Sequence, residues 1–357
     1  MQTLQFDVAI VGAGPAGSAA ALALLRRGAS VALIERRKKF EDRMGESLAG
    51  VASEALRELG VWESFQAIEQ RPSHVHRAAW GGRLEKRQNT WRRFGPDLHL
   101  DRARFDELLL QAARARGASV FRPASVRRPV PGAGSRCLLV SQESDTFELV
   151  ARWLIDATGR AGTLMRAFGA QRREFDRLIG VARSFELGAR EPSTLVEAAA
   201  DGWWYSAPQP GARMIALFVT DGDSAARVAR AESDWSRWLE SAPLTRRHLE
   251  EAAPLGASRT YLATPALLDW DPEQRAVPVG DAALSFDPIA AEGLCFALRS
   301  SIEAADALLG TRGSLVAYRD GVRGIFANHL ERRELIYASE RKLRPTPFWQ
   351  RARGPSC

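Results

Sequence analysis

The chain has 357 residues, 45% apolar and 26% charged, which is an ordinary balance for a globular protein with room for two domains. No run approaches the ~18–20 apolar residues of a membrane span, the N-terminus lacks a signal-peptide pattern, and the three cysteines form no C-x-x-C pair. The net charge of +7 comes from scattered arginines. We therefore expect a cytoplasmic protein with no disulfide framework, no metal site and no nucleic-acid partner.

The first predicted unit is a strand, glycine turn, helix and second strand over residues 6–37, FDVAIVGAGPAGSAAALALLRRGASVALIERR. Gly12, Gly14 and Gly17 form G-x-G-x-x-G directly after the strand, and Glu35 ends the second strand. Such glycines allow a tight turn, the approach of a pyrophosphate to a helix N-terminus and close helix packing, while the acid binds a ribose. The order of strand, helix and acid therefore predicts a dinucleotide site.

The rest of the chain changes character along its length. Residues 101–120 predict a helix and a strand, and residues 135–160 predict a hairpin that leads into a short buried strand. Longer extended runs fill residues 172–265, the α/β pattern resumes at 275–310, and 315–343 has helical spacing. Because the two kinds of segment interleave, we expect discontinuous domains.

These patterns predict an α/β fold with α+β elements. A Rossmann-type dinucleotide domain would be interleaved with an antiparallel-sheet substrate domain and followed by a C-terminal helical tail. The predicted boundaries are 1–70, 96–170 and 266–310 for the dinucleotide domain, 71–95 and 171–265 for the substrate domain, and 311–357 for the C-terminal helix and Arg-rich tail.

A second glycine-bearing stretch is VGDAALSFDPIAAEGL, residues 279–294, which resembles the flavoprotein signature of the p-hydroxybenzoate-hydroxylase type of fold. LIDATGR (154–160) and DRARFD (101–106) resemble further motifs of that family. The resemblance implies that the dinucleotide is FAD, held at its ribityl chain by an aspartate and faced by a helix N-terminus. Beside the glycine turn and Glu35, it implies contacts from Arg36, Arg43, Ser47, Arg102, Asp156, Gly159, Gly280, Asp281, Pro288, Gly293 and Leu294.

RMGESLAG, residues 43–50, resembles the Gly-Glu-Ser loop of flavin-dependent halogenases and their relatives. Together with AAWGG (78–82), LHLDRARFD (98–106), DGWWYSAP (201–208) and YASERKLRPTPFWQRA (337–352), it makes the chain resemble the LodB/QhpG-like flavoproteins almost from end to end. Those proteins help to build tryptophan-derived quinone cofactors. The resemblance implies a monooxygenase that acts on a tryptophan within a partner protein.

Two motifs separate oxygenation from halogenation. Halogenases carry W-x-W-x-I-P, of which this chain keeps Trp203 and Pro208 but neither the second tryptophan nor the isoleucine. They also carry P-L-E-S-T-G-I, whereas residues 288–294 read PIAAEGL, with Glu292 where its carboxylate would repel a halide. Lys86 is the only lysine between residues 40 and 341, so it alone could serve as a halogenase lysine, and a solvated loop position is the alternative.

The rings at residues 203–205 are candidates for a substrate platform. Strand alternation places Trp203 and Tyr205 on one face and Trp204 on the other, so at least one tryptophan should be ordinary core. We expect the segment to wall a cavity between sheet and flavin, because amphipathic rings can stack an indole. The acid/base candidates, each with a purely structural alternative, are Glu292 (helix N-terminal charge), His99 (strand residue) and Glu46 (capping acid).

Three functions remain open from the sequence. The first, which we favour, is an FAD-dependent monooxygenase acting on a tryptophan- or indole-like ring that is free, carrier-bound or part of a peptide or protein. The second is a reductase, dehydrogenase or halogenase-like enzyme on a small molecule, and the third is a flavoprotein escort subunit that docks through its Arg-rich tail. No second glycine fingerprint follows a strand, so electrons would come from transiently docked reduced nicotinamide or from a separate flavin reductase.

Overall fold

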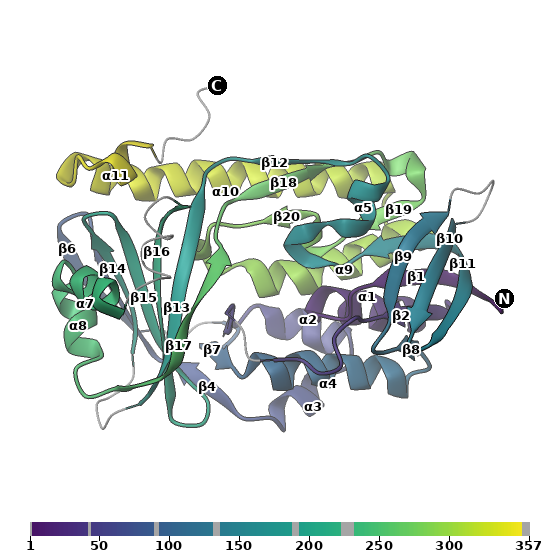
Figure 1. Ribbon diagram of the computed structural model, residues 1–357, viewed down its shortest axis with the longest axis horizontal. Helices are drawn as coiled ribbons and strands as arrows, with labels where there is room; N and C mark the ends of the chain where they lie inside the picture. Colours follow the sequence, from purple (N-terminus) through teal and green to yellow (C-terminus); the bar gives the residue numbers. More distant parts are fainter. Residues whose placement is uncertain are drawn as a thin grey trace.

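The computed structural model describes residues 2–41, 44–88, 93–130, 136–187, 193–222 and 232–351, and within them the side chains of 128–130 and 232–234 are left aside. Two sheet-centred lobes lie side by side, and the long helix α10 (Leu315–Leu343) runs along both of them (Figure 1). The predicted α/β fold class is confirmed.

The first lobe is built on a seven-stranded sheet with strands ordered β8-β2-β1-β11-β10-β9 and with β19 paired to β11. The strands around β1 pair in parallel, whereas β9, β10 and β11 form an antiparallel meander. Helix α1 packs against α4 and α9. The elements are β1 (Thr3–Val11), α1 (Pro15–Leu25), β2 (Val31–Ile34), α4 (Arg102–Ala115), β8 (Ser119–Phe121), β9 (Ser125–Val130), β10 (Arg136–Gln142), β11 (Asp145–Asp156), β19 (Ala276–Pro278) and α9 (Gly293–Leu309).

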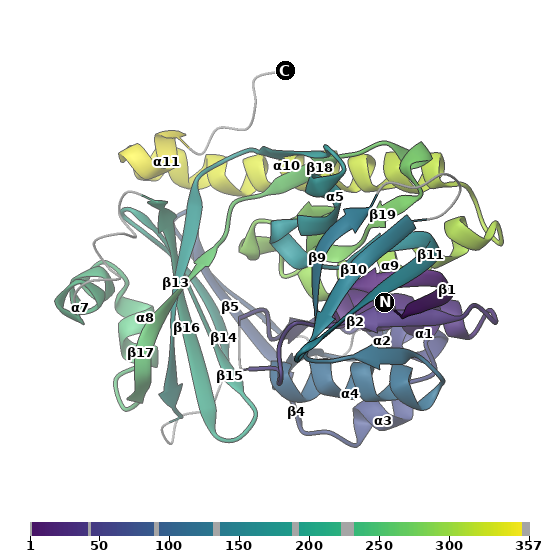
Figure 2. The ribbon, with the colours of Figure 1, turned by 45° about the vertical axis from the view of Figure 1, so that its right-hand side comes forward.

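The second lobe is a seven-stranded sheet ordered β17-β13-β16-β15-β14-β5-β6, antiparallel except for the pair β14 and β5 (Figure 2). Alternation along β15 divides its core, because Trp203 joins the rings on one face and Trp204 joins those packed against α7 on the other. The elements are β5 (Val75–Trp80), β6 (Arg83–Gln88), β13 (Leu178–Glu186), β14 (Thr194–Ala199), β15 (Gly202–Gln209), β16 (Arg213–Asp221), α7 (Glu232–Glu240), α8 (Pro243–His248) and β17 (Ala253–Leu262).

Two small sheets and several short helices complete the molecule. One sheet is ordered β3-β7-β4 and the other β12-β18-β20. These elements are β3 (Ser47–Leu48), α2 (Ala52–Glu58), α3 (Trp62–Gln66), β4 (Gln70–Ser73), β7 (Asp97–Leu100), η1 (Gly159–Ala161), α5 (Thr163–Ala167), β12 (Gln171–Glu174), β18 (Ala266–Asp269), η2 (Pro272–Gln274), η3 (Gly280–Ala282), β20 (Leu284–Ser285), η4 (Pro288–Ala290) and α11 (Pro347–Arg351).

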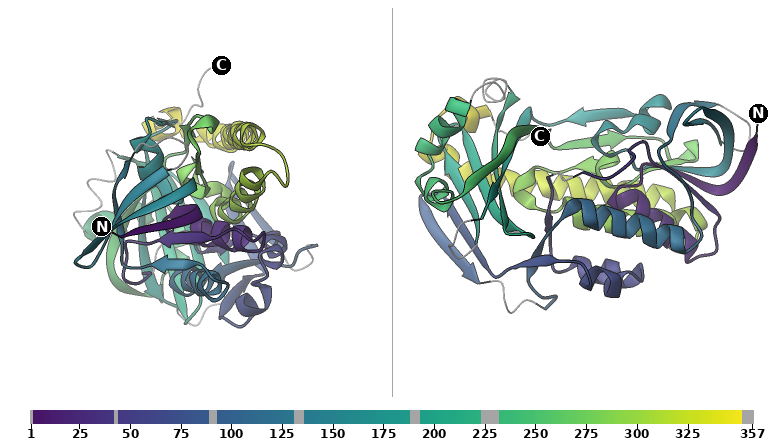
Figure 3. Two further views of the ribbon diagram at one scale, coloured as in Figure 1. Left: turned by 90° about the vertical axis from the view of Figure 1, so that its right-hand side faces the viewer. Right: turned by 60° about the horizontal axis from the view of Figure 1, so that its bottom comes forward.

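Helix α10 ties the two lobes together. Seen nearly end-on, it lies beside α9 (Figure 3, left). Near its start, Tyr318 donates a hydrogen bond to the carbonyl of Pro278 in the first lobe, over 2.9 Å. Near its end, Tyr337 packs with Trp80 and Trp349 at the second sheet. The helix therefore holds both lobes in one arrangement.

Candidate active site

A cavity of about 840 Å³ lies between the lobes, within the usual size range of ligand sites. It brings together motifs that are far apart in the sequence, because the turn after β1, the start of α9 and the inner face of the second sheet all open into it. Its walls come from residues within 11–16, 34–37, 44–47, 124–127, 157–167 and 279–297, and on the sheet side from Gly180, Trp203, Tyr205, Leu217 and 261–263.

The glycine turn has the geometry that a pyrophosphate requires. Gly12 has φ +101°, and a Cβ on it would overlap the carbonyl of Ala157 in the neighbouring strand end. Gly14 lines the cavity at the N-cap of α1, whose first turn carries no acidic residue and no side-chain cap. Its N–H groups and the positive end of its dipole are therefore available to an anionic ligand. Gly17 packs against the turn, where a Cβ on it would overlap the carbonyl of Gly12, so its role is structural.

Glu35 is fixed at the rim of the same turn. One carboxylate oxygen accepts the N–H of Ala13 at 3.0 Å and the other accepts that of Arg37 at 2.9 Å. Each oxygen keeps a further lone pair, so the carboxylate can also accept a ribose hydroxyl. Arg36 lines the cavity beside it. This arrangement fits the adenosine half of a dinucleotide.

Gly280 and Asp281 lie where α1 and α9 converge. Gly280 has φ +56°, and a Cβ on it would come within 2.7 Å of the Cβ of Ala16. Its N–H donates to Ser300 Oγ at 3.0 Å, which fixes the turn. Asp281 lines the cavity with its carboxylate 41% exposed and 3.6 Å from the Arg160 guanidinium. This carboxylate is therefore open to a hydroxyl-bearing chain such as ribityl.

The loop before α9 forms the remaining wall of the cofactor side. Pro288, Glu292, Gly293 and Leu294 all line the cavity, and Ala291 between them has φ +51°. Helix α9 then runs for 17 residues with no side-chain cap and no acid in its first turn, so its positive end faces the cavity. Such an end stabilises a group that becomes negative on reduction, which fits a flavin.

A buried ionic network, which we call the Asp287 network, holds this loop from behind. The Asp287 carboxylate accepts from Arg333 Nε at 2.7 Å and from the Tyr337 hydroxyl at 2.8 Å, while its backbone N–H donates to His329 Nε2 at 3.1 Å. Arg333 also pairs with Asp176. Sequence reasoning missed the network. The spacing of four between residues 329, 333 and 337 places them on one helix face, but it does not indicate that Asp287 lies against that face.

Two expected cofactor residues do other work, and a third lies outside the described residues. Asp156 is fully buried, and its carboxylate accepts the N–H groups of Thr158 at 2.9 Å and Met165 at 2.8 Å, so the expectation of a cofactor contact is corrected to a structural role. Arg102 lines the cavity but donates to the carbonyls of Met44 and Gly45, which fixes the loop carrying Glu46. Gly159 lines the cavity as expected, and Arg43 falls in an undescribed position.

Among the three rings, Trp203 and Tyr205 line the cavity and Trp204 does not. Trp204 faces the other side of the sheet, where its ring centroid lies 4.8 Å from Phe218 and 4.9 Å from Trp235. The expectation that Trp204 contacts substrate is therefore corrected, because strand alternation makes it core. Tyr261 on β17 joins the wall, and sequence reasoning missed it.

The acid/base candidates separate clearly. Glu46 lines the cavity and is buried, and burial raises the pKa of its carboxyl, while backbone hydrogen bonds and the charge of Arg102 work in the opposite direction. His99 does not line the cavity but lies behind Ser47, and burial lowers its pKa to about 4. Glu292 lies at the rim and pairs with Arg332 at 2.7 Å. Of these three candidates, Glu46 is the one that is both buried and part of the cavity wall.

Residues 5–310 match the family model of the FAD-binding domain. The chain belongs to this family. This FAD-binding protein is similar to the FAD-dependent oxidoreductase LodB of Marinomonas mediterranea, with 28% identity over 97% of this chain and 96% of LodB. It is also similar to the tryptophan 2-halogenase of Chondromyces crocatus, with 26% identity over 96% of this chain and 69% of the halogenase.

Solved structures extend these similarities. The flavin-dependent halogenase CmlS superposes with a TM-score of 0.90 at 25% identity, over 99% of this chain and 68% of CmlS. The peptidyl tryptophan dihydroxylase QhpG superposes with a TM-score of 0.75 at 24% identity, over 98% of this chain and 79% of QhpG, which shows the shared fold. The protein is thus an FAD-dependent oxidoreductase of the halogenase and monooxygenase family.

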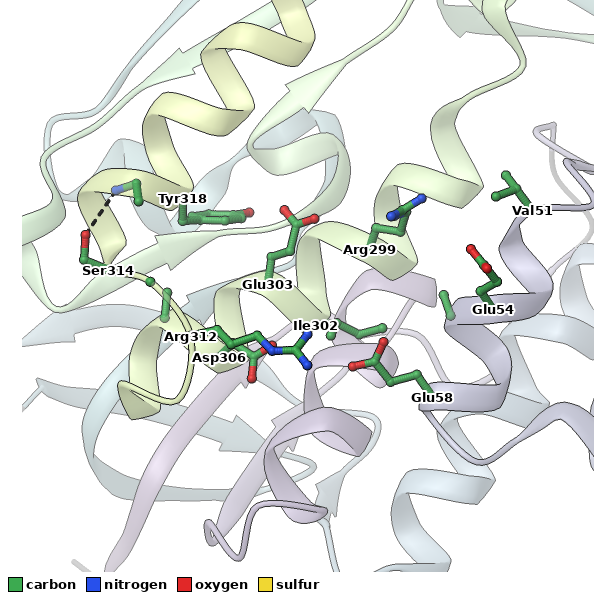
Figure 4. A pocket seen from close by; sticks show the side chains of 14 residues that line it. Val51, Glu54, Glu58, Arg299, Ile302, Glu303, Asp306, Arg312, Ser314 and Tyr318 are labelled. Carbon is green, nitrogen blue, oxygen red and sulfur yellow. Dashed lines mark hydrogen bonds between the residues drawn. The ribbon is translucent and has the colours of Figure 1, made fainter.

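A second cavity of about 570 Å³ lies between α2, α9 and the start of α10, and it shares no described lining residue with the first (Figure 4). Its charged side chains are exposed except for Asp306, which pairs with Arg27 at 2.6 Å. No group of three or more His, Cys, Asp or Glu among the described residues is arranged to hold a metal ion. In the same part of the chain, no helix has the length and apolar character needed to cross a membrane.

Proposed function

We propose that this protein is an FAD-dependent monooxygenase that hydroxylates a tryptophan- or indole-like ring carried by a peptide or protein. The observation that carries the proposal is that Trp203, Tyr205 and Tyr261 line the same cavity as the loop before α9. Aromatic walls of this kind orient a flat ring by stacking. Bound FAD would supply the oxygen chemistry there.

The chain's own residues hold the cofactor and aim the substrate. The N–H groups after Gly14 would bind the pyrophosphate, Glu35 the ribose and Asp281 the ribityl chain. The proposed division into domains follows, with 1–70, 96–170 and 266–310 binding FAD, 71–95 and 171–265 walling the substrate, and 311–357 as a C-terminal segment. Reduced nicotinamide or a partner reductase would deliver the electrons.

Glu46 is the proposed proton-transfer group of the cavity. Hydroxylation of an aromatic carbon releases the proton that the carbon carried, and a carboxylate with a raised pKa is a stronger base for that proton. Burial supplies the shift, and the loop fixed by Arg102 holds the carboxyl in place. We therefore assign Glu46 the role of general base, with Tyr205 as its hydrogen-bond partner.

Two observations favour oxygenation over halogenation. No lysine occurs among the described residues that line the cavity, and Lys86 sits on the exposed edge strand β6. The loop before α9 carries Ala290 and Ala291 where the halogenase pattern is polar. Repulsion of a halide by Glu292 is the weaker argument, because Arg332 partly balances the charge of that carboxylate.

The proposed substrate class is supported by two relatives. LodB is a full-length match, and QhpG is described as a peptidyl tryptophan dihydroxylase essential for tryptophylquinone cofactor biogenesis. We propose that this chain likewise takes a peptide-borne tryptophan. Halogenases are prominent among the other matches, so halogenation is the competing outcome of the tests.

Oxygen uptake tests the proposal. The FAD-loaded protein would be supplied with reduced flavin and with tryptophan-containing peptides or free tryptophan amide. We expect uptake above the reduced-flavin background only with tryptophan probes, and none with matched phenylalanine peptides. Reduction of an added unsaturated molecule without oxygen uptake would support a reductase instead, and binding of the peptides without any turnover would support an escort subunit.

A further inference from the structure

We propose that Tyr205, Ser47, His99, Thr194 and Ser73 form a proton relay that connects Glu46 in the cavity with the outer end of β4. The proposal rests on the function assigned to Glu46 above and deepens it, because it says where the proton goes. His99 and Thr194 act through their neighbours and are positioning residues, since neither lines the cavity.

Hydrogen bonds run without a break from Tyr205 to Ser73. Tyr205 and Glu46 both line the cavity, and burial and the neighbouring Glu46 both raise the pKa of the Tyr205 hydroxyl. This hydroxyl lies 2.7 Å from Ser47 Oγ, and Ser47 Oγ lies 3.2 Å from His99 Nδ1. On the other side of the imidazole, Nε2 lies 2.9 Å from Thr194 Oγ1. Thr194 Oγ1 lies 2.7 Å from Ser73 Oγ, and the next residue along the chain, His74, is exposed.

Every member of this chain can both donate and accept a hydrogen bond. Hydroxyl groups do so by rotation, and a neutral imidazole does so by carrying its proton on either nitrogen. Burial lowers the pKa of His99 to about 4, so the ring is neutral at physiological pH. The charged groups that act on the ring are His76, Asp97 and Arg71, and their opposing contributions are smaller than that of burial.

Burial also closes the other routes. His99 and Thr194 are 1% and 4% exposed, so bulk water does not reach the interior of the relay. Ser73, at its outer end, directly precedes the exposed His74. The groups come from β3, β4, β7, β14 and β15, which belong to two different sheets. A purely structural reading would treat the contacts as satisfied polar groups that join the two sheets.

The proton balance is simple. The protonated Glu46 gives its proton to Tyr205 Oη as the Tyr205 proton passes to Ser47. The transfer continues through His99 and Thr194, and Ser73 releases one proton to water. One proton enters at Glu46 and one leaves at Ser73, and no electrons move. Rotation of the hydroxyls resets those groups, and a flip of the imidazole ring restores the tautomer that carries its proton on the Thr194 side.

Thr194 offers a matched pair of variants. Thr194→Val keeps the shape of the side chain but removes the hydroxyl, whereas Thr194→Ser keeps the hydroxyl. Thr220→Val is the control for the substitution itself, because Thr220 is equally buried and its hydroxyl only bonds the Asp201 carbonyl. If Thr194→Val fails to fold, Ser73→Ala with Ser73→Thr gives the same comparison one step farther out.

Solvent exchange of the His99 imidazole proton tests the relay without any substrate. It would be measured by NMR on FAD-loaded protein labelled with 15N-histidine. We expect Thr194→Val to slow the exchange by roughly 100-fold, the lower end of what positioned proton transfer contributes, while Thr194→Ser and Thr220→Val exchange as the wild type does. Exchange in Thr194→Val at the wild-type rate would overturn the relay.

Turnover of a tryptophan-containing peptide adds a readout that a structural role would not move. We expect Thr194→Val to lower kcat by a similar factor and to enlarge the solvent isotope effect, with KM and FAD content unchanged. A loss of kcat without any change in the solvent isotope effect would count against the relay. If no variant, including the wild type, oxidises the peptide, the proposed function fails while the exchange measurement still decides the relay.

Discussion

Two buried polar networks flank the cavity, and they differ in charge. The Asp287 network pairs a carboxylate with the guanidinium of Arg333 and ties α10 to the loop before α9. The proposed proton relay through His99 contains only hydroxyl groups and a neutral imidazole between the cavity and β4. Buried opposite charges lock each other in place, because separating them leaves a charge without compensation. A neutral chain has no such anchor, and its protons can shift.

Two tyrosines make the difference concrete. Tyr337 donates its one proton to the Asp287 carboxyl group, and its oxygen accepts from Trp203 Nε1 at 2.8 Å, a group that can only donate. Tyr205 stands between Ser47 and Glu46, each of which can either donate or accept. A tyrosine hydroxyl therefore has a fixed structural role at Tyr337, whereas at Tyr205 it can pass a proton on.

Arg333→Ala should have the largest effect. It leaves Asp287 and Asp176 without their buried cation, which typically costs about 3–5 kcal/mol of unfolding free energy. Because the loop before α9 then loses its anchor, we also expect weaker FAD retention. Denaturant unfolding and flavin content of the purified protein measure both.

The neighbouring Arg332→Ala is the control for this prediction. Its ion pair with Glu292 is largely exposed, so we expect a loss of about 1 kcal/mol or less. Equal stability of the two variants would show that the Asp287 network does not anchor the loop.

Glu46→Gln should abolish most of the turnover and leave the fold intact. A positioned proton acceptor contributes roughly 10²–10⁴-fold, so we expect a fall in kcat of at least about 100-fold with normal FAD content. Glu303→Gln in the second cavity is the control for the substitution itself, because Glu303 lies outside the active site. A variant at Glu46 that turns over like the Glu303 variant would remove Glu46 from the mechanism.

The pH dependence of stability should report His99. The pKa of this residue falls from 6.5 in the unfolded chain to about 4 in the folded protein, so between these values the unfolded chain binds more protons. Stability is therefore complete above pH 6.5 and is lost as the pH falls toward 4, by on the order of 3 kcal/mol at 1.36 kcal/mol per unit.

His99→Gln should flatten this part of the stability curve. His329, whose pKa burial also lowers to about 4, still contributes in both proteins, so the difference between the two curves isolates His99. Denaturant unfolding at a series of pH values gives that difference. Parallel curves for the variant and the wild type would mean that the folded protein binds the His99 proton as readily as the unfolded chain does.

The two tyrosines can be separated by removing only their hydroxyls. Tyr337→Phe leaves Trp203 Nε1 without its acceptor and removes a hydrogen-bond donor from the buried Asp287 carboxylate. We therefore expect the free energy of unfolding to fall by about 1.5–3 kcal/mol. Tyr205→Phe keeps the ring on the cavity wall, and we expect its main effect on kcat. Unfolding and peptide turnover of both variants measure the contrast, and the reverse pattern would contradict the comparison.

The parts of the fold that depend on local spacing could be predicted from the sequence. The turn at Gly12 and the helix that follows it come from a motif whose members lie close together in the chain. The Asp287 network could not be predicted, because Asp287 and Arg333 lie 46 positions apart and only the packing of α10 brings them together. Alternation correctly separated Trp203 from Trp204 but did not say which face meets the cavity, since that depends on how the two lobes are docked.

Oxygenation is tested most directly by the mass of the product formed from a tryptophan-containing peptide under labelled oxygen, 18O2, with bromide at saturation. We expect a product that carries labelled oxygen and no bromine, formed by the wild type and at a much lower rate by Glu46→Gln. A brominated product, or an oxygenated one whose oxygen comes from water, would contradict this expectation.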